Sequence, residues 1–193
     1  NGEQRLLPVQ PSSSLLPVNV SAALQAVVAL GLYPGDQQVS RALAALVPPA
    51  GRRQLLQVAG RHYLLDVAHN PAAVDKMLEH IDAKYCYKRK IAVFSAMADK
   101  DIGGMLDRAL PSIDAWFLGD QVDNPRAQSA AETADLLRAR GQGMISISKN
   151  LKQAFRRAQS LLAEGDLLLV FGSFFTVAAV LPQLHRDRGK ATA

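Results

Sequence analysis

Cysteine is nearly absent from this 193-residue sequence, in which Cys86 is the only one. An internal disulfide is therefore impossible, which agrees with a reducing cytoplasm, where we place the protein. One cysteine and four scattered histidines do not show the spacing of a zinc site, so we expect no metal site. Apolar runs such as residues 167–171 fall far short of the roughly 18–20 residues of a membrane span. We expect no transmembrane helix and no membrane partner.

Two phosphate-binding motifs are also missing. Neither G-x-G-x-x-G nor G-x-x-x-x-G-K-[ST] occurs, so we expect no phosphate-cradling loop in this chain. A strong excess of one charge is lacking as well, because 22 basic residues stand against 17 acidic ones, a net charge of +5. The basic residues come in ones to threes among acids, whereas nucleic-acid-binding proteins more often gather them on one stripe. An anionic small molecule fits this mild positive charge at least as well as a nucleic acid, and we expect no nucleic-acid partner.

What remains is the composition of an ordinary globular protein, with 49% apolar residues. Residues 1–18 contain three prolines and no sustained period, which predicts an extended connector or a strand remnant. Two helices are predicted next, over residues 19–32, with Asn19 or Ser21 as N-cap, and over residues 37–46. The Pro- and Gly-containing break at 47–51 marks a domain boundary, which divides the chain into residues 1–50 and 51–193.

Beyond that break, strands and helices alternate. Residues 54–58 and 62–65 are typical of a hairpin that turns at Gly60. Further strands are predicted at 91–94, 115–118, 144–147 and 167–171, and helices at 71–84, 102–110, 129–140, 150–164 and 176–186. This alternation predicts an α/β fold, a Rossmann-like and mostly parallel sheet with helices on both faces, preceded by a short helical fragment.

Ligands of such sheets bind beyond the carboxyl ends of the strands, so the residues at these ends are candidates for a site. The first such end reads Asp66-Val67-Ala68-His69-Asn70-Pro71 and leads into a predicted helix. A helix N-terminus suits an anion, and Pro71 fits the first helical position. The alternative is that Asp66 and Asn70 only cap the turn and the helix, with His69 in solvent.

Two further strand ends carry polar residues. Asp99-Lys100-Asp101 precedes a predicted helix, where Lys100 could face a carboxylate or a phosphate. In the alternative, both aspartates cap that helix and Lys100 is solvated. Gly172-Ser173 ends the last apolar strand, where backbone and hydroxyl can approach a ligand closely or simply cap the helix that follows.

Taken in order, these segments resemble one family. The residues that carry the resemblance are Gly51-Arg52, Asp66 to Pro71, Asp99-Lys100-Asp101 and Val170 to Val177. Together they are similar to the C-terminal part of bifunctional dihydrofolate synthases/folylpolyglutamate synthases, which belong to the Mur ligase superfamily. The likeness runs from about residue 15 to residue 185.

The resemblance implies roles for individual residues. Asn19, Arg52 and Asp66 match positions that contact ATP in the family. His69 and Lys100 are the implied catalytic residues, and His69 and Ser173 match positions on the glutamate and phosphate side of the cleft. Because the linker reads Pro49-Ala50-Gly51-Arg52-Arg53, Arg53 could replace Arg52 as the ATP contact.

The resemblance also implies an activity, an ATP-dependent ligation of L-glutamate to dihydropteroate or to folyl-glutamates through an acyl phosphate. ATP and Mg²⁺ are the implied cofactors, with the magnesium ligands in an N-terminal ATPase domain outside this chain. Residues 1–50 would then be the end of that P-loop domain and the linker, and the chain alone would be inactive. The alternatives are a cell-wall Mur ligase domain and a stand-alone nucleotide-binding or regulatory α/β module.

Overall fold

The computed structural model describes residues 17–191, and the connector or strand expected at the beginning of the chain lies largely outside the described residues. The chain divides into two compact units, residues 1–52 and residues 53–193. In the first unit, helices α1 (Pro17–Ala29) and α2 (Asp36–Ala45) follow one another. Helix α2 buries Val39 and Leu43, whereas α1 buries no residue.

Helix α1 is shifted towards the N-terminus relative to its prediction. Pro17 takes up the first turn, since its fixed φ suits that position, so the N-cap expected at Asn19 or Ser21 is wrong. The helix ends at Ala29 because Gly31 adopts a left-handed φ of 69° and turns the chain.

The second unit opens with the predicted hairpin. Strands β1 (Gln54–Val58) and β2 (Arg61–Leu65) pair antiparallel, with Val58 opposite Arg61. The two residues between them, Ala59 and Gly60, have φ values of 49° and 74°. Positive φ at both positions is typical of the tight turns whose twist matches that of the two strands. The turn at Gly60 is therefore confirmed.

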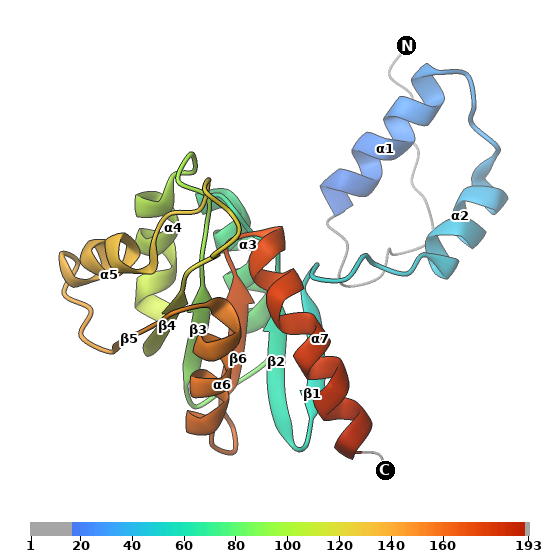
Figure 1. The fold of residues 1–193 in the computed structure, drawn as a ribbon. Helices are drawn as coiled ribbons and strands as arrows, with labels where there is room; N and C mark the ends of the chain where they lie inside the picture. The colour runs from blue at the N-terminus through green and yellow to red at the C-terminus, as the bar shows by residue number, and fades with distance from the viewer. Residues whose placement is uncertain (1–16, 192–193) are drawn as a thin grey trace. The chain divides into compact units, whose positions relative to one another are not determined.

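Six strands form one sheet in the order β1-β2-β6-β3-β4-β5, and every pair except β1–β2 is parallel (Figure 1). The remaining strands are β3 (Lys90–Phe94), β4 (Ala115–Gly119), β5 (Ile145–Ser148) and β6 (Leu167–Phe171). The helices of this unit are α3 (Pro71–Lys84), α4 (Ile102–Ala109), the 3₁₀ turn η1 (Leu110–Ser112), α5 (Ala130–Arg138), α6 (Leu151–Leu161) and α7 (Phe174–Ala191). The predicted α/β fold with a mostly parallel sheet is confirmed.

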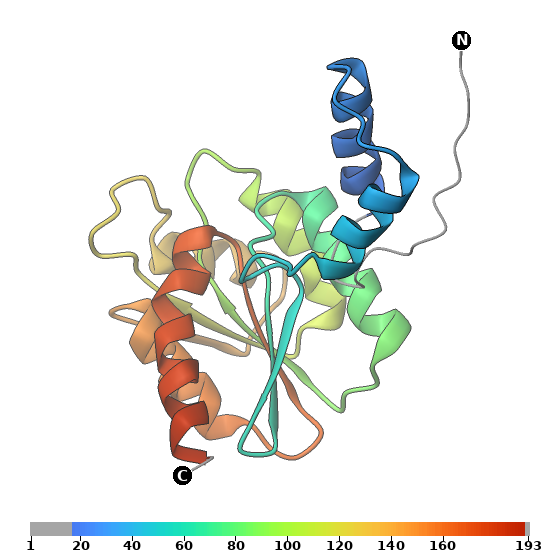
Figure 2. The ribbon, with the colours of Figure 1, turned by 90° about the vertical axis from the view of Figure 1, so that its right-hand side faces the viewer.

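Two apolar layers cover the faces of the sheet. One layer joins Trp116 and Phe171 of the strands to α3, α4 and α5, and the other joins Phe117 and Val170 to α6 and α7. Figure 2 shows α7 lying along one face of the sheet. Strand β6, at an interior position in the sheet, is buried at all five residues, as expected of a parallel strand covered on both sides.

Helix ends account for most of the differences from prediction. Ser129 and Asn150 are N-caps rather than first helical residues, because their side chains accept hydrogen bonds from Glu132 N and Gln153 N. Helix α7 is longer than predicted and continues through Pro182. Among residues 17–191, no helix is both long and apolar enough to cross a membrane.

Candidate functional site

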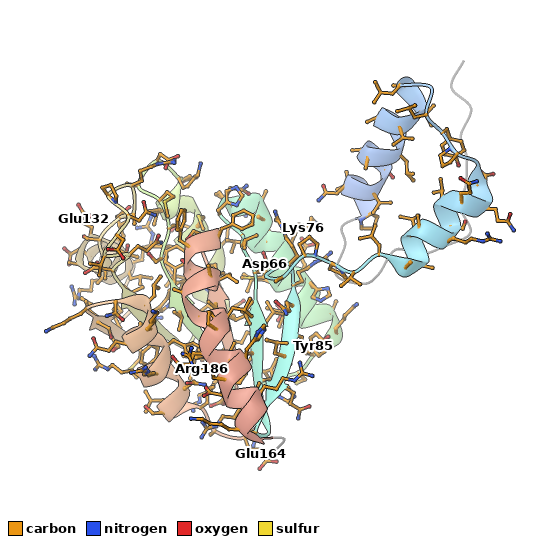
Figure 3. The ribbon with its side chains drawn as sticks, turned by 45° about the vertical axis from the view of Figure 1, so that its right-hand side comes forward. Asp66, Lys76, Tyr85, Glu132, Glu164 and Arg186 are labelled. Atoms are coloured by element: carbon orange, nitrogen blue, oxygen red, sulfur yellow. The ribbon has the colours of Figure 1, made fainter. Side chains whose placement is uncertain are left out.

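Asp66 occupies the carboxyl end of β2, next to the start of α3, and only 7% of it is exposed (Figure 3). Its Oδ1 accepts the Ala68 N–H at 2.8 Å, and its Oδ2 accepts the Arg53 N–H at 3.0 Å. Asp66 does not cap α3, because Asn70 does so by accepting the Ala73 N–H at 2.8 Å. The carboxylate therefore fixes both the turn into α3 and the chain segment that enters β1.

Arg53 is the residue that this carboxylate holds. Its φ of 44° is left-handed, a conformation that few residues other than glycine adopt. Burial lowers the pKa of the Arg53 guanidinium, while the charge of Asp66 acts in the opposite direction. Arg53 therefore turns its side chain partly into the protein, whereas Arg52, the last residue of the first unit, is exposed.

His69 follows in the same turn and is half-buried. Its Nδ1 lies 3.0 Å from the carbonyl oxygen of Val67. A carbonyl can only accept, so Nδ1 carries the proton and Nε2 of the neutral ring is left as an acceptor. The turn thus sets the tautomer and orientation of His69, as a proton acceptor or ligand contact requires.

Lys100 lies beyond the end of β3, where Asp99 pairs with two cations. Asp99 lies 3.0 Å from Lys100 Nζ and 3.3 Å from Arg126 Nη2. The hydrogen bond from Lys100, assisted by Arg126, lowers the pKa of Asp99. Asp101 caps α4 by accepting the Gly104 N–H at 2.8 Å, as expected, but the cap expected of Asp99 is wrong.

The loop after β3 is bound to the loop after β4. Met97 and Ala127 form an antiparallel bridge, with backbone hydrogen bonds from Ala98 N to Arg126 O at 2.8 Å and from Gln128 N to Ala96 O at 3.0 Å. The β4 loop therefore supports the segment that carries Lys100.

Ser173 lies at the end of β6 and is 4% exposed. Its Oγ accepts the Thr176 N–H at 3.1 Å, so the expected helix cap is present. Ser95, at the end of β3, is equally buried, and the side-chain amide of Gln121 donates to both serine hydroxyls. Sequence reasoning missed Ser95 and Gln121. Ser95 could have been found because, like Ser173, it comes just after a buried apolar strand.

Gly172 lets β6 and β3 approach each other at this point. Its φ is 113°, and a Cβ added there would lie 2.5 Å from the carbonyl oxygen of Ser95. Gly172 N also donates to Ala68 O at 3.0 Å, which ties the end of β6 to the turn that carries His69. Glycine is therefore required for the close approach and for the φ.

Beside these residues is a cavity of about 360 Å³. It is formed by the β4 loop and by the first turns of α6 and α7, and its lining includes Gln121, Asn124, Asn150, Lys152 and Phe175. Amide groups, one cation, the carboxylates of Asp120 and Asp123 and one aromatic ring give it the mixed character of a small-molecule site.

The described residues hold no group of three or more His, Cys, Asp or Glu side chains that could bind a metal ion.

The parallel strands bring Asp66, His69, Lys100 and Ser173 to one edge of the sheet, because β2, β6 and β3 are neighbours. Asn19, exposed in α1, and Arg52 belong to the first unit. The edge can offer an anion the charge of Lys100, which also pairs with Asp99, and the ring of His69, but the edge residues described above include no triphosphate cradle.

Comparison with known proteins gives one consistent result. Residues 51–174 match the family described as Mur ligase, glutamate ligase domain. The chain is 31% identical over 170 residues to the dihydrofolate synthase/folylpolyglutamate synthase of Escherichia coli, which covers 88% of this chain and 38% of that relative. It is 33% identical over 138 residues to a UDP-N-acetylmuramoyl-L-alanyl-D-glutamate–2,6-diaminopimelate ligase of Agrobacterium fabrum, covering 68% of this chain and 27% of that ligase.

Among solved structures, Escherichia coli FolC in complex with DHPP and ADP superimposes with a TM-score of 0.78 at 29% identity. The match covers 93% of this chain and 41% of that one. The chain therefore spans about two fifths of the length of the Escherichia coli enzyme and about a quarter of that of the Agrobacterium fabrum ligase.

Proposed function

The chain belongs to the Mur ligase family through its glutamate ligase domain, and on that premise we propose that it is the C-terminal part of an ATP-dependent acid–amino-acid ligase. The reaction adds L-glutamate to dihydropteroate, to folyl-glutamates, or to both. ATP transfers its γ-phosphoryl group to the acceptor carboxylate, which gives an acyl phosphate and ADP. The amine of glutamate then attacks the acyl carbon, loses a proton and expels phosphate.

The observation that carries this proposal is that hydrogen bonds hold the turns after β2 and β6 in place and join them to each other. Asp66 holds Arg53 N and Ala68 N, and Gly172 N is bonded to Ala68 O. Phosphoryl and acyl transfer depend mainly on positioning and charge neutralisation, which a rigid edge of this kind can supply.

Within this scheme the residues take distinct roles. Lys100 neutralises charge on the phosphate, and Nε2 of His69 accepts the proton that the glutamate amine loses. Ser173 lies on the glutamate and phosphate side and fixes the start of α7 through Thr176. The role of His69 uses an atom that the fold orients, since the hydrogen bond from His69 Nδ1 to Val67 O leaves Nε2 as the acceptor.

Asn19, Arg52 and Asp66 are the proposed nucleotide contacts. Asp66 also holds the linker, since its Oδ2 accepts the Arg53 N–H at 3.0 Å. Arg52 is favoured over Arg53 because its side chain is exposed and accessible to a ligand, whereas that of Arg53 is partly buried. A permanently charged planar fork suits a phosphate.

The first unit is proposed to be the end of a P-loop ATPase domain together with the linker. This interpretation is supported by the length of the relatives, of which the chain spans 38% in the Escherichia coli enzyme. Mg²⁺ would be held by residues outside 17–191. The single, exposed Cys86 supports a reducing cytoplasm as the place of action.

A cell-wall ligase is the second candidate, and the Agrobacterium fabrum relative favours it. The folate reading is preferred because the Escherichia coli folate enzyme covers more of this chain, 88% against 68%. The test uses the full-length protein, meaning this chain with an N-terminal portion of the kind its relatives have. Dihydropteroate and folyl-glutamate should be ligated to glutamate, and UDP-muramyl peptides should not react with diaminopimelate. The opposite pattern would establish the second candidate.

A further inference from the structure

Side-chain hydrogen bonds link the segments that follow β3, β4 and β6. The last acceptor in this series determines which hydroxyl group donates each bond. Thr176 Oγ1 lies 2.6 Å from the carbonyl oxygen of Ser95, which can only accept. Thr176 therefore donates its single hydroxyl proton to the Ser95 carbonyl oxygen. The 2.8 Å contact between Thr176 Oγ1 and Ser173 Oγ must then be donated by Ser173.

Ser173 consequently has its hydroxyl proton engaged. Its oxygen has two lone pairs, and these accept from Thr176 N at 3.1 Å and from Gln121 Nε2 at 3.3 Å. With 4% exposure and every bonding position used, the hydroxyl of Ser173 acts on a ligand through its neighbours. Gln121 is the only one of these neighbours that also lines the cavity beside the site.

The orientation of the Gln121 amide follows from the same reasoning. Its Nε2 donates to Ser173 Oγ and, at 2.9 Å, to Ser95 Oγ. Its Oε1 accepts from Asn124 Nδ2 at 2.9 Å. The Asn124 amide is fixed because its Oδ1 accepts the Arg126 N–H at 3.2 Å, which leaves its Nδ2 as the donor. The flipped Gln121 amide would direct Nε2 at that donor and leave Ser173 without its second donor, so the network favours one orientation.

We propose that Gln121 is a positioning residue for the amino-acid substrate of this site. Its amide fixes the β4 loop to Ser95 and Ser173 and thereby sets the wall of the cavity where Gln121 and Asn124 lie. The same loop carries Arg126, whose contact with Asp99 holds the partner of Lys100. This inference rests on the proposed ligase function. Gln121 is assigned to the amino acid rather than to ATP because the proposed function places Ser173, which Gln121 holds, on the glutamate and phosphate side of the site.

The test measures steady-state kinetics of the full-length protein with Gln121→Ala and Gln121→Glu. Both variants remove the amide donor, and the second adds a negative charge beside an anionic substrate. The KM for glutamate should rise about tenfold or more, the effect of losing two hydrogen bonds, while the KM for ATP stays within about twofold. Gln142→Ala is the matched control, because Gln142 bonds Ile113 O and Met144 N outside the network, and its KM values should not change.

A double-mutant cycle separates positioning from a general loss of structure. If Gln121 acts through Ser173, Gln121→Ala combined with Ser173→Ala raises the glutamate KM no further than the more severe single change. Strictly additive effects, or equal increases in both KM values, would overturn the role. An active wild type with a kinetically silent Gln121→Ala would overturn this inference alone. A wild type without ligase activity would overturn the proposed function and this role with it.

Discussion

The backbone N–H of Arg53 donates a 3.0 Å hydrogen bond to Oδ2 of Asp66, thirteen residues further along the chain. The bond fixes a residue with a left-handed φ of 44° at the point where the second unit begins. A strained backbone persists only where its surroundings determine it, and it is often found at functional sites. Asp66 is thus the anchor of the linker as well as a candidate nucleotide contact.

The first prediction tests that anchor with Asp66→Asn. Asparagine offers one oxygen and one NH₂ group, so either Arg53 N or Ala68 N would face a second donor. We expect a loss of about 1–3 kcal/mol in the free energy of unfolding, a folded protein and weakened use of ATP.

Asp101→Asn is the matched control for this change, because Asp101 accepts only the Gly104 N–H with its cap and asparagine caps equally well. Denaturant unfolding and ATP kinetics of both variants provide the measurement. Equal stability losses in the two variants would contradict the anchoring role of Asp66.

The second prediction separates the two linker arginines. Arg52→Ala should lower kcat/KM for ATP-dependent ligation by about 100-fold or more, as expected when a charge donor to the transferring phosphoryl group is lost. Arg53→Ala should act mainly on stability, because the Arg53 side chain is partly buried and its packing would be lost. Measuring kcat/KM for ATP and the thermal unfolding of both variants distinguishes the two roles. A nearly silent Arg52→Ala beside an inactive but stable Arg53→Ala would reverse the assignment.

The third prediction concerns Gly172→Ala. The new Cβ would meet Ser95 O at 2.5 Å in a backbone conformation that disfavours any side chain, so we expect a loss of about 1–3 kcal/mol or more. Gly143→Ala is the comparison, because nothing lies within 4 Å of its added Cβ and its φ is not left-handed. Urea unfolding curves of the two variants should differ clearly, and coincident curves would disprove the close approach of β6 and β3.

The fourth prediction is an acid dependence of stability. Asp166, 3% exposed, accepts hydrogen bonds from Arg89, which lower the pKa of Asp166 below that of an ordinary aspartate. Because this pKa is depressed in the folded state, the stabilisation is fully present above about pH 4 and is lost as pH falls through the folded-state pKa.

Asp166→Asn should therefore unfold more readily than wild type at neutral pH but lose less stability between about pH 4 and pH 2. Thermal unfolding at a series of pH values measures both. The exposed pair Lys76–Glu79 offers the control, since Glu79→Gln should change little at either pH. Parallel pH profiles for wild type and Asp166→Asn would contradict the role of this carboxylate.

The sequence predicted best those elements whose boundaries have a local cause. Helix α3 occupies residues 71–84 as expected, since Asn70 caps it and Pro71 suits its first position. Strand β6, at 167–171, is a continuous apolar run of five buried residues. Helix α7 occupies Phe174–Ala191 and extends past both ends of the predicted range 176–186, because Ser173 caps it earlier and the polar residues after 186 lack the apolar period that would have predicted its continuation.

The site was predictable only in part. Asp66, His69, Lys100 and Ser173 follow strands and could be proposed from the sequence, since parallel strands bring their carboxyl ends to one edge. Gln121 could not be proposed, because its bond to Ser173 joins residues 52 positions apart and no local pattern distinguishes it from other loop glutamines. The different burial of the two linker arginines, Arg52 exposed and Arg53 partly buried, also depends on tertiary packing, which the neighbouring residues in the sequence do not reveal.

Incorporation of labelled L-glutamate into dihydropteroate and folyl-glutamate, with ADP release measured in the same reaction, tests the central claim most directly. The full-length protein should form one ADP for each glutamate added and should need ATP. The 193-residue chain alone should form none and should bind ATP more weakly than about 1 mM, since half a site lacks preorganisation. Glutamate ligation by these 193 residues alone, or none by the full-length protein with either acceptor, would contradict the account.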